Sequence, residues 1–165
     1  MRTRLRTDRL DLALFEPSDV VELRAILGDP ASNTIGDGAH RDQQRTAGWI
    51  ERRRAEAARS GLVLYAVRLR SSGRLLGHAG ALPGRTGVEE PEIGYLVRAD
   101  ARRQGCAAEA ASAVLTELLG ERRRVWATIR PWNTPSLRIV ERLGFRPDRT
   151  ETDGRGELRY LVRDR

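Results

Sequence analysis

The feature that most constrains this chain is a change in the spacing of its apolar residues near residue 62. Before it, an alternating, strand-like stretch at residues 9–15 precedes two stretches with helical spacing, at residues 17–28 and 42–60. After it, residues 62–69 and 74–82 alternate like the strands of a hairpin, and strand-like and helix-like stretches then follow in turn. This order predicts a mixed sheet with helices on its faces, in an α/β or α+β fold.

The second half of the chain continues this alternation. Strands are expected at residues 92–97 and 125–129, around Phe145 and at 158–162, with helices at about 106–118 and 134–143. Thr134 is a candidate N-cap with Pro135 at the first helical position, and Gly144 is a candidate residue just past the helix end. No linker, repeat or low-complexity tract divides the sequence, so we expect a single domain over residues 1–165.

Composition excludes several kinds of chemistry. All 30 basic residues are arginine, which rules out a lysine nucleophile and a lysine-dependent phosphate-binding loop. The net charge of +7 is spread over arginines interleaved with acids, so nucleic-acid binding is not favoured, although an anionic small ligand would fit. Cys106 is the only cysteine, which excludes an intrachain disulfide and disfavours a metal site. Without an apolar run of about 20 residues or a signal peptide, we expect a cytoplasmic protein with no membrane partner.

The junction between the strand at 92–97 and the next helix is the most site-like feature. Small residues there let backbone amides approach a ligand, and a helix N-terminus carries about half a positive charge. The junction therefore predicts a phosphate cradle, against the alternative of an ordinary helix start with solvated arginines. Its residues are Arg102, Arg103, Gln104, Gly105, Cys106 and Ala107.

Two further polar groups fall near this junction. Glu92 lies inside the apolar run and is a candidate general base, whereas Glu89 and Glu90 are interpreted as a solvated strand end. Asn133 and Ser136 open the following helix, and they face the same side as the cradle if the intervening strand is parallel to 92–97. The alternative is that they only cap their own helix.

Four segments in the same order resemble the GNAT superfamily of N-acyltransferases, and within it the ribosomal-protein N-terminal acetyltransferases of RimJ/RimL type. They are TDRLDL, GRLLGH, EIGYLVRADARRQGCAAEA and NTPSLRIVERLGF, and RRQGCA matches the R/Q-x-x-G-x-G/A acetyl-CoA signature. The resemblance spans nearly the whole chain. It implies a GNAT-like fold with a central mixed sheet of about six to seven strands and helices on both faces, and the activity of an acetyl-CoA-dependent N-acetyltransferase.

The resemblance also implies how acetyl-CoA binds. The strand at 92–97 would splay from its parallel neighbour at a bulge, and pantetheine in the gap would pair with the backbone of Leu96 and Arg98. The diphosphate would rest on the amides of residues 104–107 beside Arg102 and Arg103. Asn133 would contact the pantetheine arm, and the Val97 amide would polarise the thioester carbonyl.

The implied reaction is direct attack of a neutral primary amine on acetyl-CoA, the amine belonging to a protein N-terminus or a small molecule. Glu92 would act as base through water. Many GNAT enzymes have a tyrosine acid on the last helix, but this chain has none between Asn133 and Gly144, and Ser136 is the alternative there. Cys106 is interpreted as a packing residue because the family forms no covalent intermediate.

The sequence gives weaker indications for His78, for Trp49 and for the acceptor. His78 is expected to be structural, and Trp49 to be buried, with a substrate contact as its alternative. The loop at 29–41 and the second helix should select the acceptor, but they contain no interpretable motif. A rival interpretation is a non-catalytic acyl-CoA sensor or interaction module on the same fold. A homodimer is compatible with either function.

Overall fold

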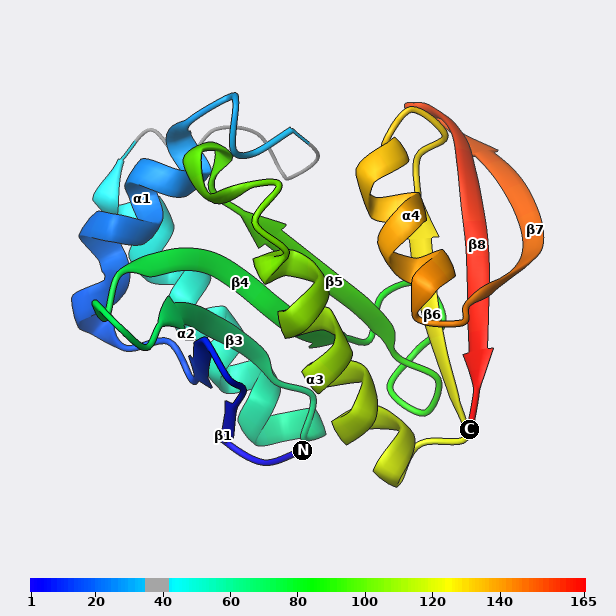
Figure 1. Cartoon of the computed structure of the whole chain (residues 1–165), viewed down its shortest axis with the longest axis horizontal. Helices are drawn as coiled ribbons and strands as arrows, with labels where there is room; N and C mark the ends of the chain where they lie inside the picture. The colour runs from blue at the N-terminus through cyan, green and yellow to red at the C-terminus, as the bar shows by residue number, and fades with distance from the viewer. Residues whose placement is uncertain (35–41) are drawn as a thin grey trace.

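The computed structural model describes residues 1–34 and 42–165, and within them the chain forms an eight-stranded mixed sheet with helices on both faces (Figure 1). The strand order is β1-β2-β3-β4-β5-β6-β8-β7. The strands are β1 (Arg4–Arg6), β2 (Leu10–Ala13), β3 (Leu64–Leu69), β4 (Leu75–Leu82), β5 (Glu92–Val97), β6 (Arg124–Ile129), β7 (Arg146–Asp153) and β8 (Gly156–Asp164). The helices are α1 (Val20–Gly28), α2 (Gln43–Ser60), α3 (Cys106–Glu121) and α4 (Thr134–Arg142), with short 3₁₀ turns at Pro17–Asp19 and Ala99–Ala101.

This architecture confirms the expected mixed α/β fold, with one strand more than expected. The additional strand is β1, which has a single buried residue, Leu5, and is too short to produce an alternating pattern. It pairs with β2 at the sheet edge. The expected helix at 17–28 begins as a 3₁₀ turn and continues as α1. Part of the expected loop at 29–40 lies outside the described residues.

The sheet is antiparallel except between β5 and β6. Among the described residues these two strands share one parallel pair, Glu92 with Trp126, where the Trp126 amide donates to the Pro91 carbonyl at 2.9 Å. Beyond this pair they diverge towards their carboxyl ends, as Figure 1 shows. On its other side β5 pairs with β4 from Glu92 to Val97 without a register shift. The expected splay is therefore confirmed, but the expected bulge in this strand is wrong.

Helices cover the two faces of the sheet with separate apolar clusters. On one face α3 buries Ala110, Val114 and Leu118, which recur at helical spacing, against residues of β2 to β6. On the other face α1 and α2 bury Leu23 and Ile50 against β3 and β4. Because burying one such side chain stabilises a fold by about 1.5–3 kcal/mol, these clusters hold the sheet that carries the site.

Capping side chains and glycines mark the helix ends, and the N-cap of α4 differs from the predicted residue. The Asp42 side chain accepts a hydrogen bond from the Arg45 amide at 2.6 Å and caps α2, which ends at Gly61 in the left-handed region (φ 72°). Gly144, past the end of α4, also has a positive φ of 80°, as expected. The N-cap of α4 is Asn133 instead of Thr134, because the Asn133 carboxamide accepts from the Ser136 amide at 3.4 Å.

Candidate active site

The N-terminus of α3 forms a cradle of backbone amides. Gly105 is the N-cap and has φ 81°, and Arg103 before it also has a positive φ, of 61°. These left-handed residues fold the chain back on itself, so that the amides of residues 104–107 have no hydrogen-bond partner in the described parts of the chain. Unpaired amides at the positive end of a 16-residue helix are suited to hold a diphosphate.

Arg9 and Glu109 hold the cradle in place. The Arg9 guanidinium donates to the Gln104 carbonyl at 2.9 Å and to the Glu109 carboxylate at 2.7 Å. Glu109 also accepts from the Arg9 amide and the Thr7 hydroxyl. Partial burial raises the pKa of Glu109, but these hydrogen bonds together outweigh it and lower the pKa. The turn between β1 and β2, which contains the TDR segment, thus braces the cradle.

The two arginines of the cradle differ in their contacts. Arg102 donates to the backbone carbonyls of Ser32 at 2.7 Å and Val97 at 3.3 Å, so it ties the cradle to the end of α1 and to β5. Both of these hydrogen-bond partners are uncharged carbonyl groups. Arg103 is exposed, and Cys106 is buried beneath the cradle as expected of a packing residue.

The diverging strands leave one edge of β5 open beyond Glu92. The Arg98 amide donates to the Leu76 carbonyl of β4 at 2.8 Å, and Leu96 is paired with His78. Bonding directions alternate along an antiparallel strand, so the backbone groups of Leu96 and Arg98 are used within the sheet. The expected pairing of these two residues with pantetheine is therefore wrong, and Tyr95 and Val97 turn their backbone groups towards the gap.

Glu92 is the buried carboxylate of the site. It is 8% exposed, and one of its oxygens accepts from the Thr128 hydroxyl of β6 at 2.7 Å. The other accepts from the Arg85 amide. Gly84 allows this close approach, since a Cβ there would stand 2.2 Å from the Glu92 carboxyl carbon. The carboxylate is therefore fixed, with lone pairs left on both oxygens for water.

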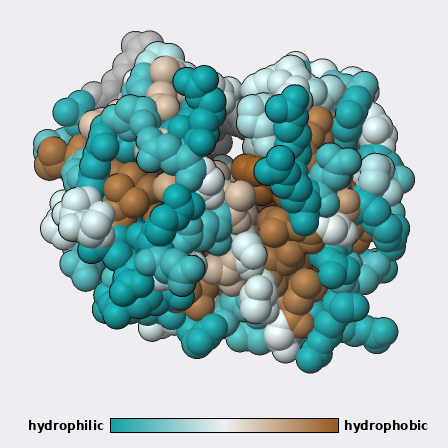
Figure 2. All heavy atoms as spheres, in the orientation of Figure 1, coloured by the Kyte–Doolittle hydropathy of each residue, from teal (hydrophilic) through white to brown (hydrophobic). Residues whose placement is uncertain are grey.

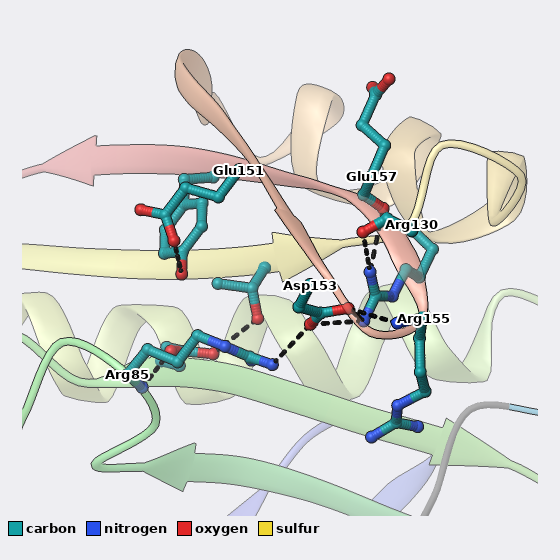
Figure 3. A network of polar contacts seen from close by, with 10 residues as sticks. Arg85, Arg130, Glu151, Asp153, Arg155 and Glu157 are labelled. Atoms are coloured by element: carbon teal, nitrogen blue, oxygen red, sulfur yellow. Dashed lines mark hydrogen bonds and ion pairs between the residues drawn. The ribbon is translucent and has the colours of Figure 1, made fainter.

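A polar network extends from Glu92 to the turn between β7 and β8 (Figure 3). The side chain of Arg85, whose amide bonds Glu92, reaches Asp153 at 3.4 Å. Asp153 in turn accepts two bonds of 2.8 Å from Arg130, which is 7% exposed and also donates to the carbonyls of Gly156 and Glu157. Because the Arg130 guanidinium is buried and bonds both Asp153 and the backbone of the turn, this network is well suited to fix the hairpin against the end of β6.

Asn133 and Ser136 lie across the gap from β5, at the start of α4. The Tyr95 hydroxyl donates to the Ser136 carbonyl at 3.2 Å and joins the two sides of the gap. Burial raises the pKa of Tyr95 to about 12, so its phenol stays protonated near neutral pH. Because neighbouring strand residues alternate between faces, Tyr95 and Glu92 leave β5 on opposite sides of the sheet. The gap therefore has Ser136 on one side and the Glu92 carboxylate on the other.

The hydroxyl of Tyr95 offers a test of this cross-link. We expect Tyr95→Phe to weaken acetyl-CoA binding about fivefold, since a single hydrogen bond contributes about 1 kcal/mol and the ring is kept. Tyr65→Phe is the matched control, because the Tyr65 hydroxyl also donates to a backbone carbonyl, that of Arg2 at 2.6 Å, away from the gap. Calorimetric titration of both variants measures the difference. Equal affinities would show that Tyr95 does not hold the gap.

The surface above the gap is hollowed. Figure 2 shows a notch between the two halves of the molecule, with hydrophobic surface below it, and Figure 1 places α3 and α4 on its two sides. The phosphate cradle, the open edge of β5 and the start of α4 thus adjoin one furrow. An elongated molecule with a diphosphate at one end and an apolar arm matches these three features.

Three residues that hold the site were not singled out from the sequence: Gly84, Arg85 and Thr128. Gly84 and Arg85 lie in a loop and Thr128 on another strand, so no local spacing connects them with Glu92. The GR pair before a run of acids is a weak turn signal. In the described ranges no helix is long and apolar enough to cross a membrane, and no group of three or more His, Cys, Asp or Glu could hold a metal ion.

Comparison with known proteins agrees with this geometry. The acetyltransferase (GNAT) domain family model matches residues 9–146, and the chain therefore belongs to the GNAT acetyltransferase family. The uncharacterized protein YkkB of Bacillus subtilis is 30% identical over 153 residues, which are 90% of this chain and 88% of YkkB.

Solved structures show the same fold. An acetyltransferase (GNAT family) from Bacillus anthracis is 23% identical with a TM-score of 0.83, over 98% of both chains. A RimL ribosomal L7/L12 α-N-protein acetyltransferase in complex with coenzyme A is 16% identical with a TM-score of 0.79, over 96% of this chain and 95% of that one. The expected GNAT family and fold are thereby confirmed, with a RimL protein among the structural neighbours.

Proposed function

We propose that this chain is an acetyl-CoA-dependent N-acetyltransferase that acts on a primary amine, either a protein N-terminal α-amine or a small-molecule amine. The observation that carries the proposal is the convergence of three groups along one gap: the unpaired amides at the start of α3, the open edge of β5 at Val97, and the buried Glu92 carboxylate. The neighbouring complex of RimL with coenzyme A supports a related cofactor here.

In the proposed binding mode the diphosphate lies on the amides of residues 104–107, with Arg102 and Arg103 adding positive charge. The pantetheine arm follows the open edge of β5 at Tyr95 and Val97, and Asn133 contacts it from α4. The Val97 amide then donates to the thioester oxygen, which stabilises the negative charge that develops there.

In the proposed reaction the neutral amine attacks the thioester carbon, and an N–C bond forms as the C–S bond breaks. The nitrogen loses a proton to Glu92 through water. A lysine-like amine has a pKa of about 10.4 and an α-amine one of about 8, so the base matters more for the former. The departing thiol has a pKa of about 8.5, which makes it an acceptable leaving group, and in this proposal Ser136 orients the sulfur or relays a proton.

Titration calorimetry with acetyl-CoA, followed by an amine panel with detection of released thiol, tests the proposal. The panel contains tetrapeptides with free N-termini, polyamines and aminoglycosides. We expect micromolar binding of acetyl-CoA and transfer to at least one class. The absence of lysine removes side-chain self-acetylation as a background signal. A folded protein that binds no acetyl-CoA would refute the proposal.

A second candidate is a non-catalytic acyl-CoA sensor on the same fold. Both oxygens of Glu92 are already hydrogen-bonded, and α4 has no tyrosine to serve as an acid. Both facts are compatible with a protein that binds acyl-CoA but does not catalyse acyl transfer. Tight acetyl-CoA binding without transfer to any amine of the panel would favour this candidate.

A further inference from the structure

A strip of partly exposed residues crosses the middle of the sheet on the face that carries α1 and α2. His78 and Leu82 of β4 and Gly94 and Leu96 of β5 are all partly exposed, although both strands are central in an eight-stranded sheet. Leu82 and Leu96 pack against the apolar cluster under α1 and α2, which establishes the face. These residues form a strip of partly accessible surface on the side opposite α3 and α4, and we refer to this strip as the groove.

His78 is the polar side chain in this strip. Its ring lies 5.6 Å from that of Trp49 on α2 at an interplanar angle of 44°. Its Nδ1 is buried and has no hydrogen-bond partner in the parts of the chain that the structure describes, so Nε2 is the nitrogen available to a ligand.

The charge of His78 is set by its surroundings. Burial, followed by the nearby positive charge of Arg53, lowers the pKa of His78 to about 4. The Arg53 guanidinium lies 5.2 Å from the Trp49 ring centre, on the same helix. The imidazole is thus neutral at pH 7, and a neutral imidazole has one nitrogen that accepts a hydrogen bond.

We propose that His78 binds the amine substrate, with its imidazole accepting a hydrogen bond from an N–H group of that substrate in the groove. The inference rests on the proposed function, because it places the amine opposite the α3 and α4 face that would hold acetyl-CoA. His78 pairs across the ladder with Leu96, the neighbour of Val97. It therefore lies one strand from the amide that would hold the thioester oxygen.

His78 and Glu92 have separate tasks in this arrangement. Glu92 precedes Leu96 by four residues on β5, which is about 13 Å at 3.3 Å per residue. This is the separation of the Cα atoms, and both oxygens of Glu92 are held by Thr128 and the Arg85 amide, so we assign the two side chains to different groups of the reaction. His78 orients the substrate in the groove, while Glu92 receives the proton through water.

Steady-state kinetics of His78→Phe test the proposal with the amine that wild type acetylates. The aromatic ring is kept and its nitrogens are lost, so we expect KM for the amine to rise about fivefold to tenfold. We expect kcat and the Kd of acetyl-CoA to stay within about twofold. His78→Gln, which keeps an acceptor near the position of Nε2, should recover most of the loss. An unchanged KM, or an equal change in acetyl-CoA affinity, would overturn the proposal.

A second measurement does not require turnover. Diethyl pyrocarbonate modifies neutral imidazoles, and at pH 6 His78 is neutral whereas amines are protonated and unreactive. We expect labelling of His78, separated from His40 by peptide mapping, to be slowed by spermidine or by a tetrapeptide beginning with alanine, and not by acetyl-CoA alone. Protection by acetyl-CoA alone, or by none of these compounds, would overturn the inference. Protection by an amine in a protein without transferase activity would support the inference and refute the proposed function.

Discussion

Glu92→Gln is expected to lower kcat by about 10²-fold or more and to leave the Kd of acetyl-CoA nearly unchanged. General base catalysis contributes about 10² to 10⁴ in rate, and the amide has nearly the same shape but cannot take up the proton. Tyr95 contacts Ser136 of α4, and Glu92 leaves β5 on the opposite face, so the carboxylate lies away from α4 and cofactor affinity should not depend on its charge. Steady-state kinetics and calorimetric titration measure the two quantities separately.

Glu90→Gln is the matched control for this variant. Glu90 lies just before β5, and its carboxylate accepts from the Trp126 indole at 2.7 Å, so it too joins β5 to β6. A change of kcat in Glu92→Gln alone would mark Glu92 as the base. If Glu92→Gln lowers turnover and acetyl-CoA affinity together, the carboxylate serves to hold Arg85 and Thr128 in place and does not act as a base.

Gly105→Ala is expected to weaken acetyl-CoA binding at least tenfold. The left-handed conformation of residue 105 costs a side-chain-bearing residue about 1–2 kcal/mol, and the new Cβ would lie 3.2 Å from the guanidinium of Arg9. Relief of this strain moves the turn that carries the cradle amides. Each hydrogen bond to a charged group contributes about 1.5–3 kcal/mol, so the loss of one bond is enough for a tenfold effect.

Gly61→Ala separates this effect from general destabilisation. Gly61 has nearly the same backbone conformation (φ 72°) at the end of α2, with nothing within 4 Å of an added Cβ. Both variants should lower the free energy of unfolding by a similar amount in urea titrations. Calorimetry should show weakened acetyl-CoA binding in Gly105→Ala alone, and equal affinities in the two variants would mean that the cradle does not hold the diphosphate.

Local sequence patterns correctly predicted most helices and strands and the turn at the start of α3. The alternation of apolar residues predicted the strands from β2 to β6, and helical spacing predicted α2 and α3, because each pattern reflects which side chains one element must bury. β1 was missed because three residues are too few for a period. The N-cap of α4 was placed one residue late because Asn133 and Thr134 are both good capping residues, and the backbone conformation decides between them.

Within the candidate site, too, some features could be predicted from the sequence and others could not. The left-handed glycine and small residues of the cradle follow one another in the sequence, so the sequence alone was enough to locate this turn at the start of α3. Which backbone groups of Leu96, Val97 and Tyr95 face the gap depends on how β5 pairs with β4. Hydrogen bonds alternate along a strand, so a shift of one residue exchanges the groups that face β4 and those that face the gap.

The amino-acid sequence by itself determined the fold class, the family resemblance and the position of the turn at the start of α3, because these depend on residues that are neighbours in the sequence. Only the tertiary structure decided that Thr128 and the Arg85 amide fix Glu92, and that His78 is partly exposed beside Trp49. The physical reason is that these contacts join separate strands, loops and helices. Their geometry is set by how the whole sheet packs, and no local spacing records it.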